Sequence, residues 1–78
     1  MHEVGIAKEV LNISLGRAAG KKIKSITVEL ADDGHTTAAT FTSAFTMVSQ
    51  GTVAEGAVLK IRNSDELESR VLELEVEQ

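Results

Sequence analysis

The chain has 78 residues, a net charge of −4 at neutral pH, no cysteine, and two phenylalanines as its only aromatic residues. This length supports a single domain over residues 1–78, and the lack of cysteine excludes disulfides and thiolate zinc sites. The chain lacks the basic face with interleaved aromatic residues that would indicate nucleic-acid binding. It also lacks the run of about 18 apolar residues that is needed to cross a membrane. We therefore expect a soluble, cytoplasmic protein that binds neither nucleic acid nor membranes.

The first predicted element is a helix over residues 3–18. Gly20 suits a helix C-cap, and Arg17 lies where the helix dipole favours a positive charge. The apolar positions recur at intervals of three and four residues, in a row formed by Val4, Ala7, Leu11 and Leu15. This pattern predicts an amphipathic helix with one side on the core.

A strand is predicted next, over residues 25–30. Ile26, Val28 and Leu30 alternate there with polar residues, as in a strand with one buried and one wet face. The Asp-Asp-Gly sequence at residues 32–34 is typical of a turn and ends the strand.

The segment over residues 37–50 is compatible with two structures. Its threonines are poor helix formers and favour a strand. However, Phe41 and Phe45 are four residues apart, Val48 lies near the same side, and Gly51 suits a C-cap. Because the segment is also long for a strand, we predict a helix.

Two more one-sided strands are predicted near the end of the chain, joined by a polar loop over residues 63–70. Their apolar positions are Leu59, Ile61, Leu72, Leu74 and Val76. Their outer faces carry opposite charges, Lys60 and Arg62 in one strand and Glu73 and Glu75 in the other. We therefore expect these two strands to be antiparallel neighbours, joined by modest cross-strand ion pairs.

The predicted order of elements is α-β-α-β-β. Each strand has one polar face, so the helices can cover only the other face. The sequence therefore predicts an α/β fold of the two-layer α+β type, with two helices on one face of a three-stranded mixed sheet. The first two strands should be parallel, because the second helix connects them as a crossover.

The Met1-His2-Glu3 sequence is the most distinctive chemical feature of the chain. A free amine, the backbone nitrogen of His2 and the Nδ1 atom of its ring can close chelate rings on one metal ion, and Glu3 can complete the plane. Cu(II) and Ni(II) both favour such square-planar nitrogen and oxygen ligands, so the pattern alone does not choose between them. Met1 should be retained, because initiator methionine is usually removed only before small residues. The alternative interpretation is a solvent-exposed terminal histidine without a metal.

Two other groups of residues invite a functional interpretation. His35 lies close to Asp32 and Asp33, but Asp-Asp-Gly-His is ordinary turn sequence. Alternate glutamates near the C-terminus are more simply the solvated face of a strand: Glu73, Glu75 and Glu77. No nucleophile–base pair or cofactor motif is visible, so we do not expect an enzyme.

Residues 1–7 (MHEVGIA) and 51–57 (GTVAEGA) resemble the HypA family of nickel metallochaperones. Members of that family insert nickel into hydrogenases and, in some bacteria, supply urease. The resemblance covers residues 1–62, resumes near residue 70, and implies the same two-helix, three-strand domain. It also implies that Met1, His2 and Glu3 hold Ni(II) transiently, with His2 as the essential ligand.

The resemblance implies partners as well: a hydrogenase large subunit or a maturation GTPase, which would take the metal by ligand exchange. Family members carry a zinc domain with two Cys-x-x-Cys pairs between their last two strands, where this chain has only the loop over residues 63–70. We therefore expect no zinc. The sequence also departs from the family at residues 31–33 (Ala-Asp-Asp), where a glycine and an apolar residue are usual. The alternative is a metal-free protein-interaction module of the same fold.

Overall fold

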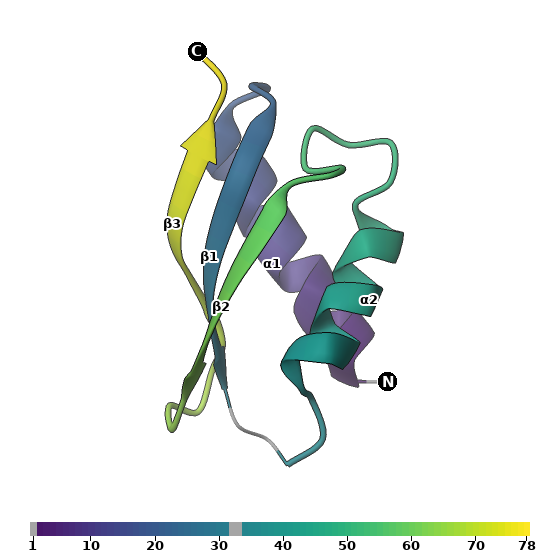
Figure 1. Cartoon of the computed structure of the whole chain (residues 1–78), viewed down its shortest axis with the longest axis vertical. Helices are drawn as coiled ribbons and strands as arrows, with labels where there is room; N and C mark the ends of the chain where they lie inside the picture. The colour runs from purple at the N-terminus through teal and green to yellow at the C-terminus, as the bar shows by residue number, and fades with distance from the viewer. Residues whose placement is uncertain (1, 32–33) are drawn as a thin grey trace.

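The structure is a computed structural model that describes residues 2–31 and 34–78, apart from the side chain of His2. The element order is α-β-α-β-β, as predicted (Figure 1). The elements are α1 (His2–Ala18), β1 (Ile23–Ala31), α2 (Ala38–Val48), β2 (Val58–Ser64) and β3 (Arg70–Val76). In the part of the chain that the structure describes, neither helix is long and apolar enough to span a membrane.

The three strands form one mixed sheet in the order β2-β1-β3, and both helices lie on the same face of it (Figure 1). β1 is parallel to β2 and antiparallel to β3. At the middle of the sheet Thr27 lies between Lys60 of β2 and Glu73 of β3. The predicted fold class and the predicted parallel pairing of the first two strands are therefore confirmed.

The predicted pairing of β2 with β3 is wrong, because β1 lies between them. β1 is the most deeply buried strand, and even its polar Ser25 and Thr27 are less than 10% exposed because strands flank it on both sides. The cross-strand ion pair instead joins Arg70 to Glu29, with Nη2 2.7 Å and Nε 3.1 Å from Oε1. The hydrogen bond and charge of Glu29 raise the pKa of Arg70 above its ordinary value.

The Thr-rich segment before and within α2 forms the predicted helix because its threonines bond to the backbone. Thr37 is the N-cap, and its Oγ1 accepts a hydrogen bond from the backbone N–H of Thr40 at 3.1 Å. The Oγ1 of Thr40 in turn accepts one from the N–H of Thr37 at 2.9 Å. This reciprocal capping box satisfies two donors that the helix itself cannot satisfy.

The core lies between the helices and the inner face of the sheet. Phe41 is fully buried, and its ring centroid lies 5.9 Å from that of Phe45. The other members of this buried cluster are aliphatic. The buried aliphatic residues are Ala7, Val10, Leu11, Ala18, Ile23, Ile26, Val28, Leu30, Ala44, Ala54 and Val71.

The inner face of β3 differs from the prediction at one position. Val71 is buried in the core, whereas Leu72, predicted to point inward, is only half-buried and is absent from the residues that pack on the core. The pairing with β1 shifts at this point, from Thr27–Glu73 to Val28–Val71, which leaves Leu72 as an extra residue in a bulge. The guanidinium of Arg17 on α1 donates to the carbonyl oxygen of Val71 at 3.1 Å.

Candidate functional site

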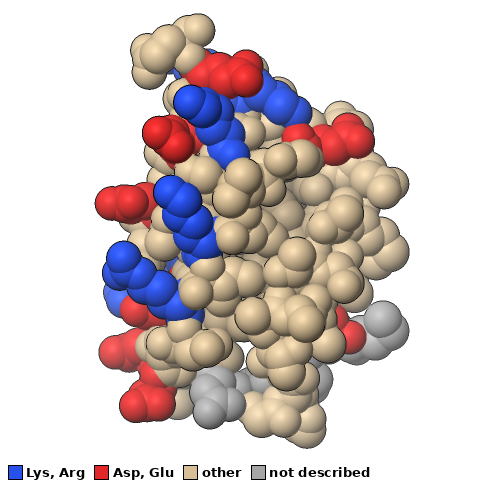
Figure 2. All heavy atoms as spheres, viewed as in Figure 1, with Lys and Arg blue, Asp and Glu red and all other residues tan. Residues whose placement is uncertain are grey.

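The N-terminus of α1 lies beside α2, away from the sheet (Figure 1). Glu3, whose side chain is half-buried, and Val4 form one wall of a shallow groove of about 400 Å³. The other wall belongs to α2: Ala39, Thr40, Ser43, Ala44 and Met47. Residues 36–54 contain no charged residue, and in Figure 2 the side of the molecule that α2 occupies is almost free of charged side chains.

The backbone at the start of α1 has amide nitrogens that make no hydrogen bond within the helix and are therefore available to a metal ion. The first four N–H groups of an α-helix have no carbonyl partner within the helix. α1 begins at His2, so the amide nitrogens of His2 and Glu3 belong to this unpartnered group. An amide that lost its proton to a metal there would break no hydrogen bond of the helix. Glu3 in the first turn also brings negative charge to the positive end of the helix dipole.

The described residues neither complete nor contradict the predicted ligand set. Met1 and the side chain of His2 lie outside them, so the triplet Met1, His2 and Glu3 stays a prediction. Within residues 3–31 and 34–78, no three histidine, aspartate or glutamate side chains come together as a metal site.

The second histidine lies on the segment that leads into α2. His35 is exposed and precedes the capping box at Thr37 by two residues. Asp32 and Asp33, which the sequence places near it, lie outside the described residues. The position of His35 immediately before a helix cap agrees with its interpretation as turn sequence.

The C-terminal glutamates lie on the open face of the sheet, opposite the helices. Glu73 and Glu75 are exposed, and the hydroxyl of Ser25 donates to Oε1 of Glu75 at 3.2 Å. Glu73, Glu75 and Lys60 line one shallow depression on this face. This mixture of charges is that of a solvated strand face, as the sequence indicated.

The second string of the resemblance, residues 51–57, forms the turn that carries the chain from α2 to β2. Gly51 and Gly56 both have φ near +80°, a conformation that glycine adopts without strain. The hydroxyl of Thr52 donates to the carbonyl of Ser49 at 2.7 Å and accepts from the N–H of Ala54 at 3.1 Å. Ala54 is 1% exposed and belongs to the core.

Further hydrogen bonds join this turn to the start of β1. The N–H of Ile23 donates to the backbone carbonyl of Val53 at 2.9 Å. The ammonium of Lys22 donates to the backbone carbonyl of Glu55 at 2.6 Å. The carboxylate of Glu55 accepts from the N–H of Gly51 at 3.1 Å. The residues of the 51–57 segment therefore stabilise this turn and its contact with β1. In Figure 1 the turn lies at the opposite end of the molecule from the N-terminus.

One surface feature was missed in the sequence. Leu67, in the predicted polar loop, is 96% exposed and lies at the edge of a groove beside α1. The available signal was its isolation: it is the only apolar residue between Ile61 and Val71. A single leucine in an acidic loop is easily dismissed, because isolated exposed apolar residues are common.

Comparison with known proteins shows the family to which the chain belongs, and it is the HypA family. Residues 1–69 match the family model described as "Hydrogenase/urease nickel incorporation, metallochaperone, hypA". A relative in Rippkaea orientalis (strain PCC 8801 / RF-1), named "Hydrogenase maturation factor HypA", is 36% identical over 61 residues. That alignment includes 78% of this chain and 54% of the relative, so the chain spans about half the length of the relative it matches.

Proposed function

Because the chain belongs to the HypA family, we propose that it is a nickel metallochaperone of hydrogenase maturation that binds Ni(II) transiently at its N-terminus. The observation that carries the proposal is the family match, which begins at residue 1 and therefore includes the Met1-His2-Glu3 triplet. The proposed ligands are the amine of Met1, the amide nitrogen and ring of His2, and Glu3. The proposal includes no chemical reaction, only the binding and transfer of a metal ion.

The start of α1 supports this ligand set in two ways. The amide nitrogens of His2 and Glu3 are not required by the helix, as described above. A +2 ion beside the positive end of a helix dipole is unfavourable unless its ligands neutralise it. One ionised amide and the carboxylate of Glu3 supply the two negative charges needed.

The surroundings of Glu3 support transfer by ligand exchange. Its side chain faces an open groove whose other wall, on α2, carries no charge. Donor atoms of a recipient protein can therefore approach this side of the site and displace the ligands one at a time. The recipients we propose are a hydrogenase large subunit or a maturation GTPase, and no zinc takes part in the transfer.

The contribution of the terminal amine can be tested by NMR. Ni(II) in a square-planar field is diamagnetic, so the amide signals of Glu3 and Val4 should move on nickel addition without broadening. The matched control is the same protein with the amine of Met1 acetylated, which removes that amine from the chelate without creating a new one and should abolish the response. An equal response in both proteins would contradict the proposed ligand set.

Nickel affinity should also fall as the pH is lowered. Protons compete for the ring of His2 and for the terminal amine, whose ordinary pKa values are about 6.5 and about 7.7–8.0. A titration that showed no loss of affinity between neutral pH and about pH 5.5 would mean that neither group is a ligand.

A further inference from the structure

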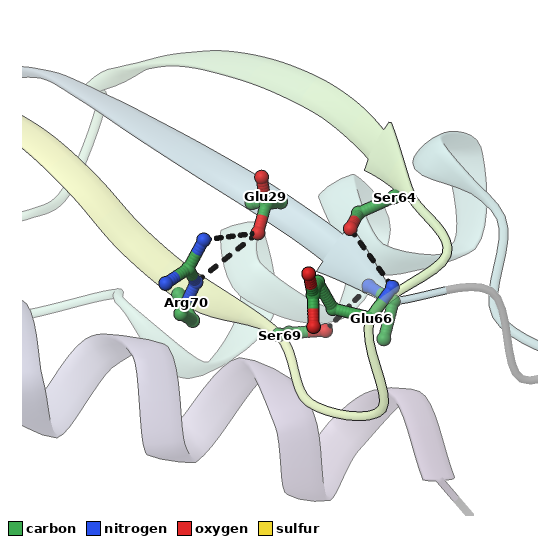
Figure 3. Close-up of polar contacts among 6 residues, drawn as sticks. Glu29, Ser64, Glu66, Ser69 and Arg70 are labelled. Carbon is green, nitrogen blue, oxygen red and sulfur yellow. Dashed lines mark hydrogen bonds and ion pairs between the residues drawn. The ribbon is translucent and has the colours of Figure 1, made fainter.

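A second groove lies between α1 and the loop that joins β2 to β3. Its volume is about 180 Å³, and its apolar wall includes Ile6 and Ile13 of α1 and Leu67 of the loop. Leu67 is 96% exposed and Ile13 is 38% exposed. Figure 3 shows the loop lying over α1. An isolated apolar side chain on a surface needs no explanation, but here two exposed ones, Ile13 and Leu67, meet the partly buried Ile6 at one groove.

The loop that presents Leu67 is held in place by hydrogen bonds on both sides (Figure 3). The hydroxyl of Ser64 accepts from the N–H of Glu66 at 3.0 Å. The hydroxyl of Ser69 accepts from the N–H of Ala31 at 2.9 Å, which ties the loop to the end of β1. Arg70, the next residue, is paired with Glu29. These contacts hold the backbone on both sides of Leu67, which lowers the entropic cost of ordering the loop when a partner binds.

Acidic side chains surround this groove. Glu9 and Glu68 line it, and Asp65 and Glu66 lie on the same loop. Figure 2 shows acidic side chains at the lower left of the molecule, the end at which Figure 1 places this loop. The groove beside α2, by contrast, has Glu3 as its one charged lining residue among those described.

The spacing along α1 indicates the shape of a complementary partner. Ile6 and Ile13 are seven residues apart, so they lie on the same side of the helix, two turns from each other. A helix laid along α1 repeats its own side chains at this interval, which lets apolar residues of two helices interdigitate.

We propose that this groove binds a basic amphipathic helix of a partner protein. An apolar side chain of that helix enters between Ile13 and Leu67, while its lysine or arginine side chains pair with Glu9 and Glu68. The surface requires no nickel, so it goes beyond the proposed metal site and can be tested separately. Ile6 follows Glu3 by one helical turn, so a partner bound here lies next to the start of α1.

The test uses the metal-free protein and a synthetic helical peptide of about 15 residues, with leucines at heptad positions and lysines elsewhere. Peptide binding is followed by the amide signals of the labelled protein. The signals that move should be those around Ile6, Ile13 and Leu67, and an equivalent peptide with glutamates in place of lysines should not bind. Raising the salt concentration should weaken binding, because part of it is electrostatic.

Variants of the groove separate its two contributions. Leu67→Ser should weaken peptide binding about tenfold or more, since a buried leucine contributes about that much. Glu68→Lys should weaken it about threefold, as expected for one exposed ion pair. Val58→Thr is the matched control: Val58 is 59% exposed on β2, away from the groove, and its substitution should change nothing.

Three results would overturn the proposal. They are equal peptide binding in Leu67→Ser and Val58→Thr, signal changes centred elsewhere, or self-association that Leu67→Ser abolishes, which would assign the groove to a second copy of the chain. Nickel binding by Leu67→Ser should equal that of the unaltered protein. A failure of the groove is therefore distinguishable from a failure of the metal site.

Discussion

The two segments that carry the family resemblance, residues 1–7 and 51–57, differ in what the fold requires of them. Thr52, Ala54 and Glu55 each bond to the backbone or pack in the core, so the second segment is fixed by the rest of the molecule. In the first segment, Ala7 belongs to the core and Val4 and Ile6 pack against it, whereas Glu3 lines the groove beside α2.

A distinctive sequence string can therefore have either of two causes: the fold requires it, or a chemical function does. The 51–57 string contains the glycines and the acid that often accompany a phosphate or metal site, yet its residues serve a turn. Glu3 of the Met-His-Glu triplet is not among the residues that pack on the core, so its presence needs a separate explanation, and the nickel site proposed above would provide one. Variants in the second segment should therefore reduce stability, and variants of the proposed ligands in the first should affect metal binding alone.

The largest effect is expected for Ala54→Asp. Ala54 is 1% exposed, so the new carboxylate would be buried without a partner, at a cost of about 3 kcal/mol or more. For a domain of this size such a loss approaches the total stability, which is of the order of 5 kcal/mol. Urea denaturation followed by circular dichroism measures it. A variant as stable as the parent protein would show that this turn is not part of the core.

A smaller loss is expected for Thr52→Val. The substitution keeps the shape of the side chain but removes both hydrogen bonds of the hydroxyl, one of which satisfies the N–H of Ala54. The free energy of unfolding should fall by about 1–2 kcal/mol. Thr42→Val, at an exposed position of α2, is the matched control and should remain within about 0.5 kcal/mol of the parent. Equal effects in both variants would contradict a structural role for Thr52.

The smallest effect is a gain in stability, expected for Ser14→Ala on α1. Ser14 is fully buried, and its hydroxyl has no hydrogen-bond partner among the described residues. Alanine removes this unsatisfied group and favours the helix, so the free energy of unfolding should rise by about 1 kcal/mol. Thermal denaturation measures the change. Nickel affinity should not move with it, and a parallel change would mean that metal binding depends on the stability of α1.

The fold was largely predictable because its elements have clear hydrophobic periods. The spacing of Phe41 and Phe45 indicated a helix despite the threonines, and Thr37 proved to be its N-cap, with Thr40 of the first turn completing the capping box. The strand order was not predictable from charge, because opposite charges on two strands do not require that they be neighbours. The bulge at Leu72 was also hidden, because either of the adjacent residues Val71 and Leu72 could have pointed inward.

The candidate sites were predictable to different degrees. The N-terminal triplet could be found from the sequence, because the chelating atoms of Met1 and His2 are adjacent along the chain. The groove at Leu67 could not, because Ile13 and Leu67 are far apart in the sequence and meet only when the loop folds over α1. Sites built from neighbouring residues are visible in a sequence, whereas sites built from distant segments require the structure.

The proposed nickel site at the N-terminus is tested most directly by a calorimetric Ni(II) titration of protein with an unblocked N-terminus, beside His2→Ala. Any purification tag must be placed at the C-terminus, because an extension before Met1 would take its amine into a peptide bond. We predict stoichiometric binding at micromolar affinity or tighter that is lost in the variant, whose stability is unchanged. Equal, weak binding in both proteins would contradict the nickel site and favour a metal-free interaction module.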